Sequence, residues 1–194
     1  MRISQTISPR INHLAPYFDG SAMTNGQPWR AAWPLQEGAA AGSAMTAGRE
    51  HWYLLSWQFD RAATTGAINV ITGVGSTSIV VGVYRLGAGN IPGTQTGRFV
   101  LDSASNGYKT FTLTSPWMPG TWRWVCIYTE GAVTVVSASP SNAPVLTLGQ
   151  GSNAPAGAFS RDSIAVANAA PATAPALTAL TIRNIAIPCL MGKS

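Results

Sequence analysis

Charge is scarce in this chain. Only 10% of its 194 residues are charged, whereas about a quarter of the residues in a typical soluble domain are charged. The net charge of +5 arises from twelve bases and seven acids, and the bases are spread along the sequence. Nucleic-acid binding needs clustered cations that neutralise neighbouring phosphates, so we expect no nucleic-acid partner. A surface with so few charges favours a protein that is partly covered by other subunits.

Chemistry-bearing residues are also few. The two histidines, His13 and His51, and the two cysteines, Cys126 and Cys189, share no motif. The sequence has no CxxC pair, HExxH segment, nucleophile elbow or phosphate-binding glycine loop. The seven acids are isolated, at positions typical of Asx turns and solvated strand ends. We therefore predict that the protein is not an enzyme and uses no cofactor or metal. Buried free thiols are the favoured state of the cysteines, and a disulfide stays an open alternative.

Long hydrophobic runs are missing as well. No stretch of eighteen apolar residues could cross a bilayer. The first residues, Met-Arg-Ile-Ser-Gln-Thr-Ile-Ser-Pro, contain no apolar segment that resembles a signal peptide. We expect synthesis in a cytoplasm, without export and without membrane insertion.

The residues that are abundant predict a β-sandwich. Twenty glycines, thirteen prolines and 46% apolar residues indicate a globular, turn-rich chain. Runs of β-branched and aromatic residues alternate with turn signals, and none shows a convincing helical period. We predict an all-β fold, an antiparallel jelly-roll-like β-sandwich over residues 46–194. The expected strands occupy residues 50–59, 67–72, 77–86, 108–114, 121–129, 132–137 and 177–187.

Four local expectations follow from the pattern. Residues 73–76 have the spacing of a hairpin turn. In residues 78–84 both alternating sets are apolar, which predicts a central strand covered on both faces. The alanine-rich stretch 37–47 is the best helix candidate, weakened by its glycines. The last apolar run is expected to end at Pro188.

Residues 1–45 are predicted to form an extended N-terminal arm. Prolines 9, 16, 28 and 34 prevent a long helix. Tyr17, Phe18, Trp29 and Trp33 make the segment too apolar for a solvated linker, and we interpret them as docking anchors. The arm is expected to pack either on its own sandwich or on a neighbouring subunit.

Tryptophan is the one residue type in excess, with seven copies. Trp52, Trp57, Trp122 and Trp124 lie in predicted strands, where filling the core is favoured over binding a ligand. Trp117 differs because prolines flank it in the turn between two strands. For Trp117 the sequence leaves two alternatives open, ligand binding at an exposed loop tip and capping of the sandwich end. Tyr108, at the start of the preceding strand, is the predicted second ring of the ligand platform.

An ordered set of short motifs resembles a β-sandwich domain of tailed-bacteriophage virion proteins. The set begins with an opening in which a threonine and alanine lead into an aromatic strand. It continues with a Gly-hydrophobic-Tyr strand, two Pro-Gly turns, a strand that begins with glycine and a tryptophan-rich strand. The matching segments are Met45–Tyr53, Val81–Tyr84, Ile91–Gly93, Gly107–Leu113, Met118–Gly120 and Trp122–Val125.

The resemblance implies a structural protein of a phage particle, a fibre, tail-tip or surface component that contacts the host. It carries over no catalytic residue, because the matched positions are turn glycines and core aromatics. It further implies a homo-oligomer, most often a trimer, located in the virion with other virion proteins as partners. If the protein is an attachment module, we expect a host surface glycan as its ligand. The open alternatives are a capsid or tail decoration (cement) protein without receptor contact and, less favoured, an enzyme or a free-standing binding protein.

Overall fold

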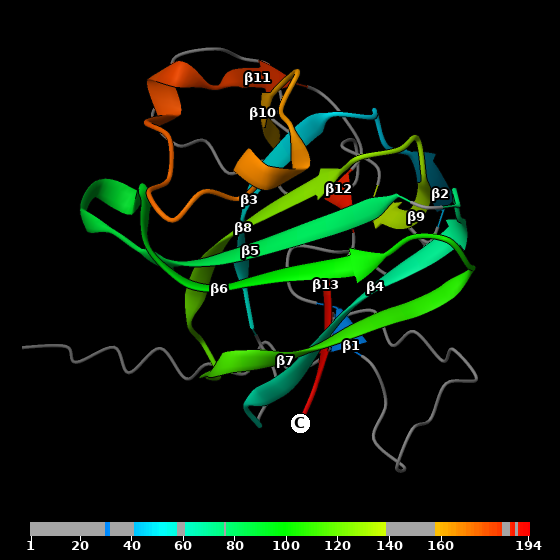
Figure 1. Cartoon of the computed structure of the whole chain (residues 1–194). Helices are drawn as coiled ribbons and strands as arrows, with labels where there is room; N and C mark the ends of the chain where they lie inside the picture. The colour runs from blue at the N-terminus through cyan, green and yellow to red at the C-terminus, as the bar shows by residue number, and fades with distance from the viewer. Residues whose placement is uncertain are drawn as a thin grey trace, which may run out of the picture.

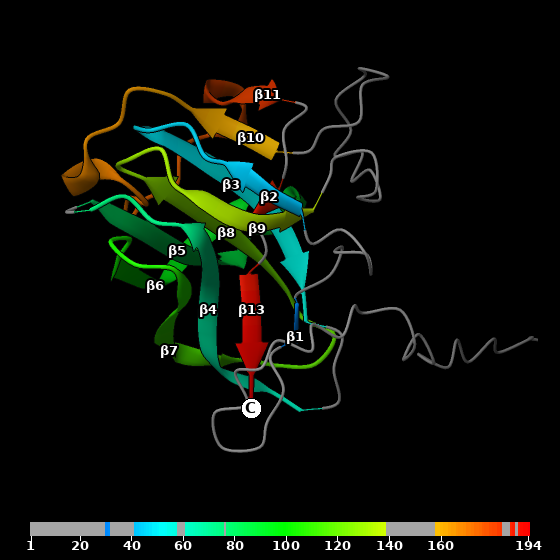
Figure 2. The same ribbon diagram turned by 90° about the vertical axis from the view of Figure 1, so that its right-hand side faces the viewer.

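Two antiparallel sheets lie face to face in the computed structural model of the chain (Figures 1 and 2). The structure describes residues 30–31, 41–57, 61–75, 77–138, 158–183, 187–188 and 190–194. Figure 2 shows β4 and β13 in one layer and β3, β5 and β8 in the other. The predicted all-β sandwich is therefore confirmed.

The seven-stranded sheet has the order β1-β13-β4-β9-β12, with β2 paired to β9 and β7 paired to β4. Its strands are β1 (Arg30–Ala31), β2 (Ala41–Ala44), β4 (Ala63–Thr72), β7 (Gly107–Trp117), β9 (Thr134–Ala138), β12 (Ile187–Pro188) and β13 (Leu190–Lys193).

The six-stranded sheet has the order β11-β10-β3-β8-β5-β6. Its strands are β3 (Arg49–Ser56), β5 (Ser78–Leu86), β6 (Pro92–Asp102), β8 (Trp122–Thr129), β10 (Ala158–Arg161) and β11 (Thr181–Arg183). The described residues also include the 3-10 turns η1 (Ala88–Asn90), η3 (Val166–Asn168) and η4 (Leu177–Ala179).

The main core lies between the two sheets. Alternate residues of the six-stranded sheet face it, because successive side chains of a strand point to opposite faces. Ile79, Val81 and Val83 of β5 point into this core. The intervening Val80 and Tyr84 point into a second apolar cluster on the outer face of the same sheet. The prediction that β5 is covered on both faces is thus confirmed.

Connections between strands mostly cross from one sheet to the other. From β3 to β9, the connection between β5 and β6 is the one that stays within a sheet. The predicted hairpin at residues 73–76 is therefore wrong, because β4 and β5 belong to different sheets. The short glycine-containing link matches a sheet-to-sheet crossing as well as a hairpin, and the two cannot be told apart from spacing. Gly73 is required there, since a Cβ at this position would lie 2.4 Å from the Ser103 carbonyl oxygen.

Two further expectations are wrong. Within the alanine-rich stretch expected to be helical, residues 41–44 form strand β2 against β9. A Cβ at Gly42 would lie 2.7 Å from Ile71 Cδ1, so the small residues allow close packing in the sheet. The last apolar run is not one strand, because η4, β11 and β12 divide it. The last strand of this run, β12, does end at Pro188 as expected, and a further strand, β13, follows it and pairs with β4.

Part of the predicted arm belongs to the sandwich. Residues 30–31 pair with β13, and residues 41–44 pair with β9. These residues therefore pack on their own subunit, one of the two destinations predicted for the arm. Most of residues 1–40, including the anchors Tyr17, Phe18, Trp29 and Trp33, lies outside the described residues.

We predict that Gly192→Val lowers the free energy of unfolding by about 1–3 kcal/mol, because a larger side chain overpacks the core. A Cβ at Gly192 would lie 2.8 Å from the Trp57 ring and 3.0 Å from Ala63 Cβ. Urea unfolding followed by tryptophan fluorescence measures the effect. Gly75→Ala is the control, since its Cβ would meet no described atom within 4 Å. Wild-type stability for Gly192→Val would contradict the position of β13 in the fold.

Candidate functional site

A segment that we call the strap, residues 162–180, covers the outer face of the six-stranded sheet. It connects β10 to β11 and contains η3 and η4. Figure 1 shows these orange segments lying over β3, β8 and β5. Under the strap lies the second apolar cluster. Its largest buried members are Trp52, Trp124, Tyr84, Tyr128 and Phe159.

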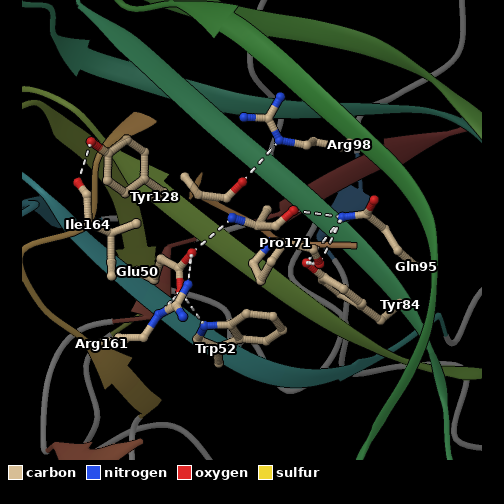
Figure 3. Close-up of polar contacts among 11 residues, drawn as sticks. Glu50, Trp52, Tyr84, Gln95, Arg98, Tyr128, Arg161, Ile164 and Pro171 are labelled. Atoms are coloured by element: carbon tan, nitrogen blue, oxygen red, sulfur yellow. Dashed lines mark hydrogen bonds and ion pairs between the residues drawn. The ribbon is translucent and has the colours of Figure 1, made fainter. Parts of the chain in front are cut away.

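Glu50 is the central polar residue beneath the strap (Figure 3). Its side chain is fully buried, in β3, next to Trp52. Its carboxylate accepts two hydrogen bonds from Arg161 of β10, from Nε at 3.0 Å and from Nη2 at 3.1 Å. It also accepts the Trp52 indole N–H at 3.0 Å and the Ala170 backbone N–H at 2.8 Å. Four donors from three segments thus converge on one buried carboxylate, which is how a protein compensates the cost of removing charge from water.

Ala170 is held in an uncommon backbone conformation. Its φ is +49°, in the left-handed region, although it is not glycine. Such a residue costs about 1–2 kcal/mol and persists where its surroundings determine it. Both of its backbone polar groups are bound, the N–H by Glu50 and the carbonyl by Gln95 Nε2 at 2.8 Å. Two strands of the sheet, β3 and β6, therefore fix this point of the strap.

The triplet Gly82-Val83-Tyr84 explains how the strap comes so close. A Cβ at Gly82 would lie 2.6 Å from the Ala170 Cβ, so only glycine leaves room. The Tyr84 hydroxyl donates to the Pro171 carbonyl at 2.8 Å and accepts from Gln95 at 3.2 Å. Val83 points to the opposite face, into the main core. Each residue of the triplet thus has a structural role in this fold.

Further side chains hold the rest of the strap by its carbonyl groups. Arg98 of β6 donates to the carbonyls of Ala169 and Val166, each at 2.9 Å. The Tyr128 hydroxyl donates to the Ile164 carbonyl at 3.0 Å. At the start of the strap, Arg49 and Asp162 form an ion pair.

Burial changes the acidity of the groups below the strap. It raises the pKa of the Tyr84 hydroxyl above its ordinary value of 10.0, and the nearby Cys126 adds to the shift. Burial, and secondly the charge of Glu50, raises the pKa of the Cys126 thiol well above 9.0. Both groups are therefore neutral in the folded protein, as inert members of the cluster rather than nucleophiles.

The chemistry of this network is structural. Both carboxylate oxygens of Glu50 accept hydrogen bonds, and the other side chains bind backbone groups of the strap. Within the described part of the chain, no three His, Cys, Asp or Glu side chains gather where they could hold a metal ion. None of the described helical segments is long and apolar enough to span a membrane.

The predicted ligand platform of Trp117 and Tyr108 is not present. Trp117 is only 2% exposed, and its indole N–H donates to the Thr121 carbonyl at 3.0 Å. Its ring centre lies 6.2 Å from that of Trp57 in the main core. The expected exposed indole is therefore wrong, and Trp117 is instead a member of the main core. The prolines that suggested a displayed ring instead lie beside an inward-pointing side chain.

Tyr108 lies at the other end of the same strand. It is half-buried beside the main core, and burial raises its pKa. Trp117 lies nine positions further along β7, which is roughly 30 Å at the rise of an extended strand. The two rings cannot contact one ligand unit. The separation of the two rings could have been predicted from the sequence, since residues 108–114 were expected to be extended.

The other strand tryptophans behave as predicted. Trp52, Trp57 and Trp124 are buried in one of the two cores, and Trp122 is partly buried against the second.

The prediction for the acids is confirmed for one residue and wrong for another. Asp102 accepts the Ala104 N–H at 2.8 Å in an Asx turn, as expected. Glu50 was predicted to be solvated and is instead the buried centre of the strap network. An acid inside an apolar strand was the only signal for it.

Cys126 is free and buried, as predicted for both thiols, and Cys189 lies outside the described residues. Comparisons of the chain with protein-family models and with curated proteins find no match.

We predict that Glu50→Gln lowers the free energy of unfolding by about 3 kcal/mol, because it breaks a buried ion pair and sets an amide N–H against other donors. The value is at the low end for such pairs, since the Arg161 side chain is 30% exposed. Urea unfolding measures the change. The control is Glu130→Gln, whose exposed carboxylate accepts only the Ser78 N–H among its described contacts and should change stability by less than about 1 kcal/mol. Equal effects of the two substitutions would contradict the role of Glu50.

Stability is predicted to fall at alkaline pH. Tyr84 and Cys126 have folded pKa values above their ordinary ones, so the unfolded chain ionises them first. Their contribution is complete below about pH 9 and is lost above it, by up to about 1.4 kcal/mol per pH unit for each group. Urea unfolding at pH 8, 10 and 11 measures the slope, and Tyr84→Phe should make it shallower. A flat profile from pH 8 to 11 would show that these groups are not sealed from water.

Proposed function

We propose that the chain is a structural protein of a bacteriophage particle, a fibre, tail-tip or surface component that contacts the host cell. The observation that carries the proposal is the use of the polar side chains on the outer face of the six-stranded sheet. Glu50, Tyr84, Gln95 and Arg98 all bind the strap and hold it rigidly on this face. This use is what a particle component needs and what an enzyme site does not supply.

The motif series that resembles phage virion domains is the second support. Its positions have structural reasons in this fold, as the Gly82-Val83-Tyr84 triplet illustrates. Gly107 and Gly120, from two other motifs of the series, have φ values of +107° and +71°, which favour glycine. We further propose that the chain assembles as a homo-oligomer, with three copies as the working hypothesis, alongside other virion proteins. Its low charge, 10% of residues, favours such burial between subunits.

The proposal predicts that the protein is found on purified particles and that the free protein competes for the host. An antibody against the chain should label particles in electron microscopy at a defined position. Purified protein, added to host cells before infection, should slow adsorption in a dose-dependent way. Heat-denatured protein is the control.

Two other results have distinct meanings. Labelled particles with unchanged adsorption would identify a decoration or cement protein, the alternative role, and particles lacking the protein should then lose heat resistance. Absence of the protein from particles would overturn the proposal.

A further inference from the structure

One end of the sandwich combines positive charge with exposed apolar side chains. We call it the basic end and define it by Arg85, Leu86, Ile91, Met118 and Arg123. The strand register brings these residues to the same end. Arg85 lies opposite Arg123, and Leu86 lies opposite Pro92 beside Ile91. Figure 1 shows the turns after β5 and after β7 on the same side of the molecule.

Two arginines face each other across neighbouring strands at this end. Like charges directly opposite in a sheet are destabilising. The stability of the sheet therefore does not explain why two arginines occupy these paired positions. Arg123 is largely buried and uses its guanidinium on neutral acceptors, the carbonyls of Ser115 at 3.0 Å and Pro116 at 2.7 Å. Arg85 is exposed. Burial, and secondly the charge of Arg85, lowers the pKa of Arg123.

The described acids lie elsewhere. Asp102 pairs in register with Ser78, and the Glu130 backbone N–H donates to the Ser78 carbonyl, which places both at the opposite end. Asp162 is also there, paired with Arg49. Glu50 is sealed under the strap. Asp60 lies outside the described residues. Among the described residues, the positive charge of Arg85 and Arg123 therefore has no carboxylate partner.

The same end exposes apolar side chains on its turns. Ile91 is 49% exposed and Met118 is 53% exposed, with Leu86 at 37%. Three of the five large exposed apolar residues of the described chain thus lie at the basic end. The two remaining ones, Ile71 and Val100, lie near the C-terminal ends of β4 and β6, away from the basic end.

We propose that the basic end binds an acidic polysaccharide through its carboxylates, an inference that rests on the proposed contact with the host surface. Arg85 offers the planar guanidinium fork that matches a carboxylate, and Arg123 strengthens the local positive field. The C–H faces of the sugar rings pack on Leu86, Ile91 and Met118. Arg85, Leu86 and Arg123 lie in β5 and β8, which are inner strands of the six-stranded sheet. An extended acidic peptide therefore finds no free strand edge for main-chain pairing at these positions.

Binding to polygalacturonate tests the proposal, with fully methyl-esterified polygalacturonate as the neutral polymer and polyglutamate as the acidic peptide. Isothermal titration should show binding to polygalacturonate that weakens with salt, and much weaker binding to the other two. Arg85→Gln should weaken binding by about tenfold or more, the loss expected for one charge-assisted bidentate contact. Lys109→Gln, which removes the same charge from the opposite end beside Asp102, should leave binding unchanged.

Three results would overturn the inference: no binding of the wild type to polygalacturonate, equal binding to polyglutamate, or equal losses in the two variants. Unchanged thermal unfolding of both variants shows that the comparison concerns binding and not folding. Adsorption separates this inference from the proposed function. If wild type and Arg85→Gln compete equally for host cells, the particle role stands and the basic end is not the contact.

Discussion

The buried carboxylate of Glu50 is the interaction on which the outer half of the structure depends. It joins β3, β10 and the strap through four hydrogen bonds, none longer than 3.1 Å. A buried carboxylate without these donors would cost several kcal/mol. The burial of the Glu50 charge therefore depends on the position of the strap. The strap has to place the Ala170 N–H within hydrogen-bond distance of the carboxylate, with Ala170 in a left-handed conformation. Packing alone would allow the strap to slide over an apolar face, whereas the carboxylate specifies one position.

The strap held by Glu50 gives the six-stranded sheet a second covered face. The six-stranded sheet has a core on each face, one shared with the seven-stranded sheet and one beneath the strap. Its central strands are consequently apolar on both sides, and their backbones have little freedom. Such a support suits a protein whose contacts lie at its ends, because turns can differ in sequence while the sheets hold them in place. The basic end, with its turns after β5 and β7, is placed in this way.

Much of the fold could be predicted from alternation and turn residues. The strands β5 and β8 were expected within one residue of their observed bounds, and three strand tryptophans fill the cores as anticipated. Strand β7 was expected to end at residue 114 but continues to Trp117. What failed required partners distant in sequence. Spacing at residues 73–76 could not tell a hairpin from a crossing between sheets. Flanking prolines could not show that the Trp117 ring points inward. The role of Glu50 depends on Ala170, 120 residues away, and no local pattern reports such a pairing. For the site, therefore, the sequence indicated residue types but not which of them meet.

Native-state hydrogen exchange of the Ala170 amide tests the central claim most directly, because this N–H is the strap's bond to the carboxylate. If Glu50 fixes the strap, the Ala170 amide should exchange only through global unfolding, with the same free energy and the same denaturant dependence as the amides of β8 such as Cys126. Exchange of Ala170 at a much lower free energy, independent of denaturant while β8 stays protected, would show that the strap opens on its own and would contradict the account.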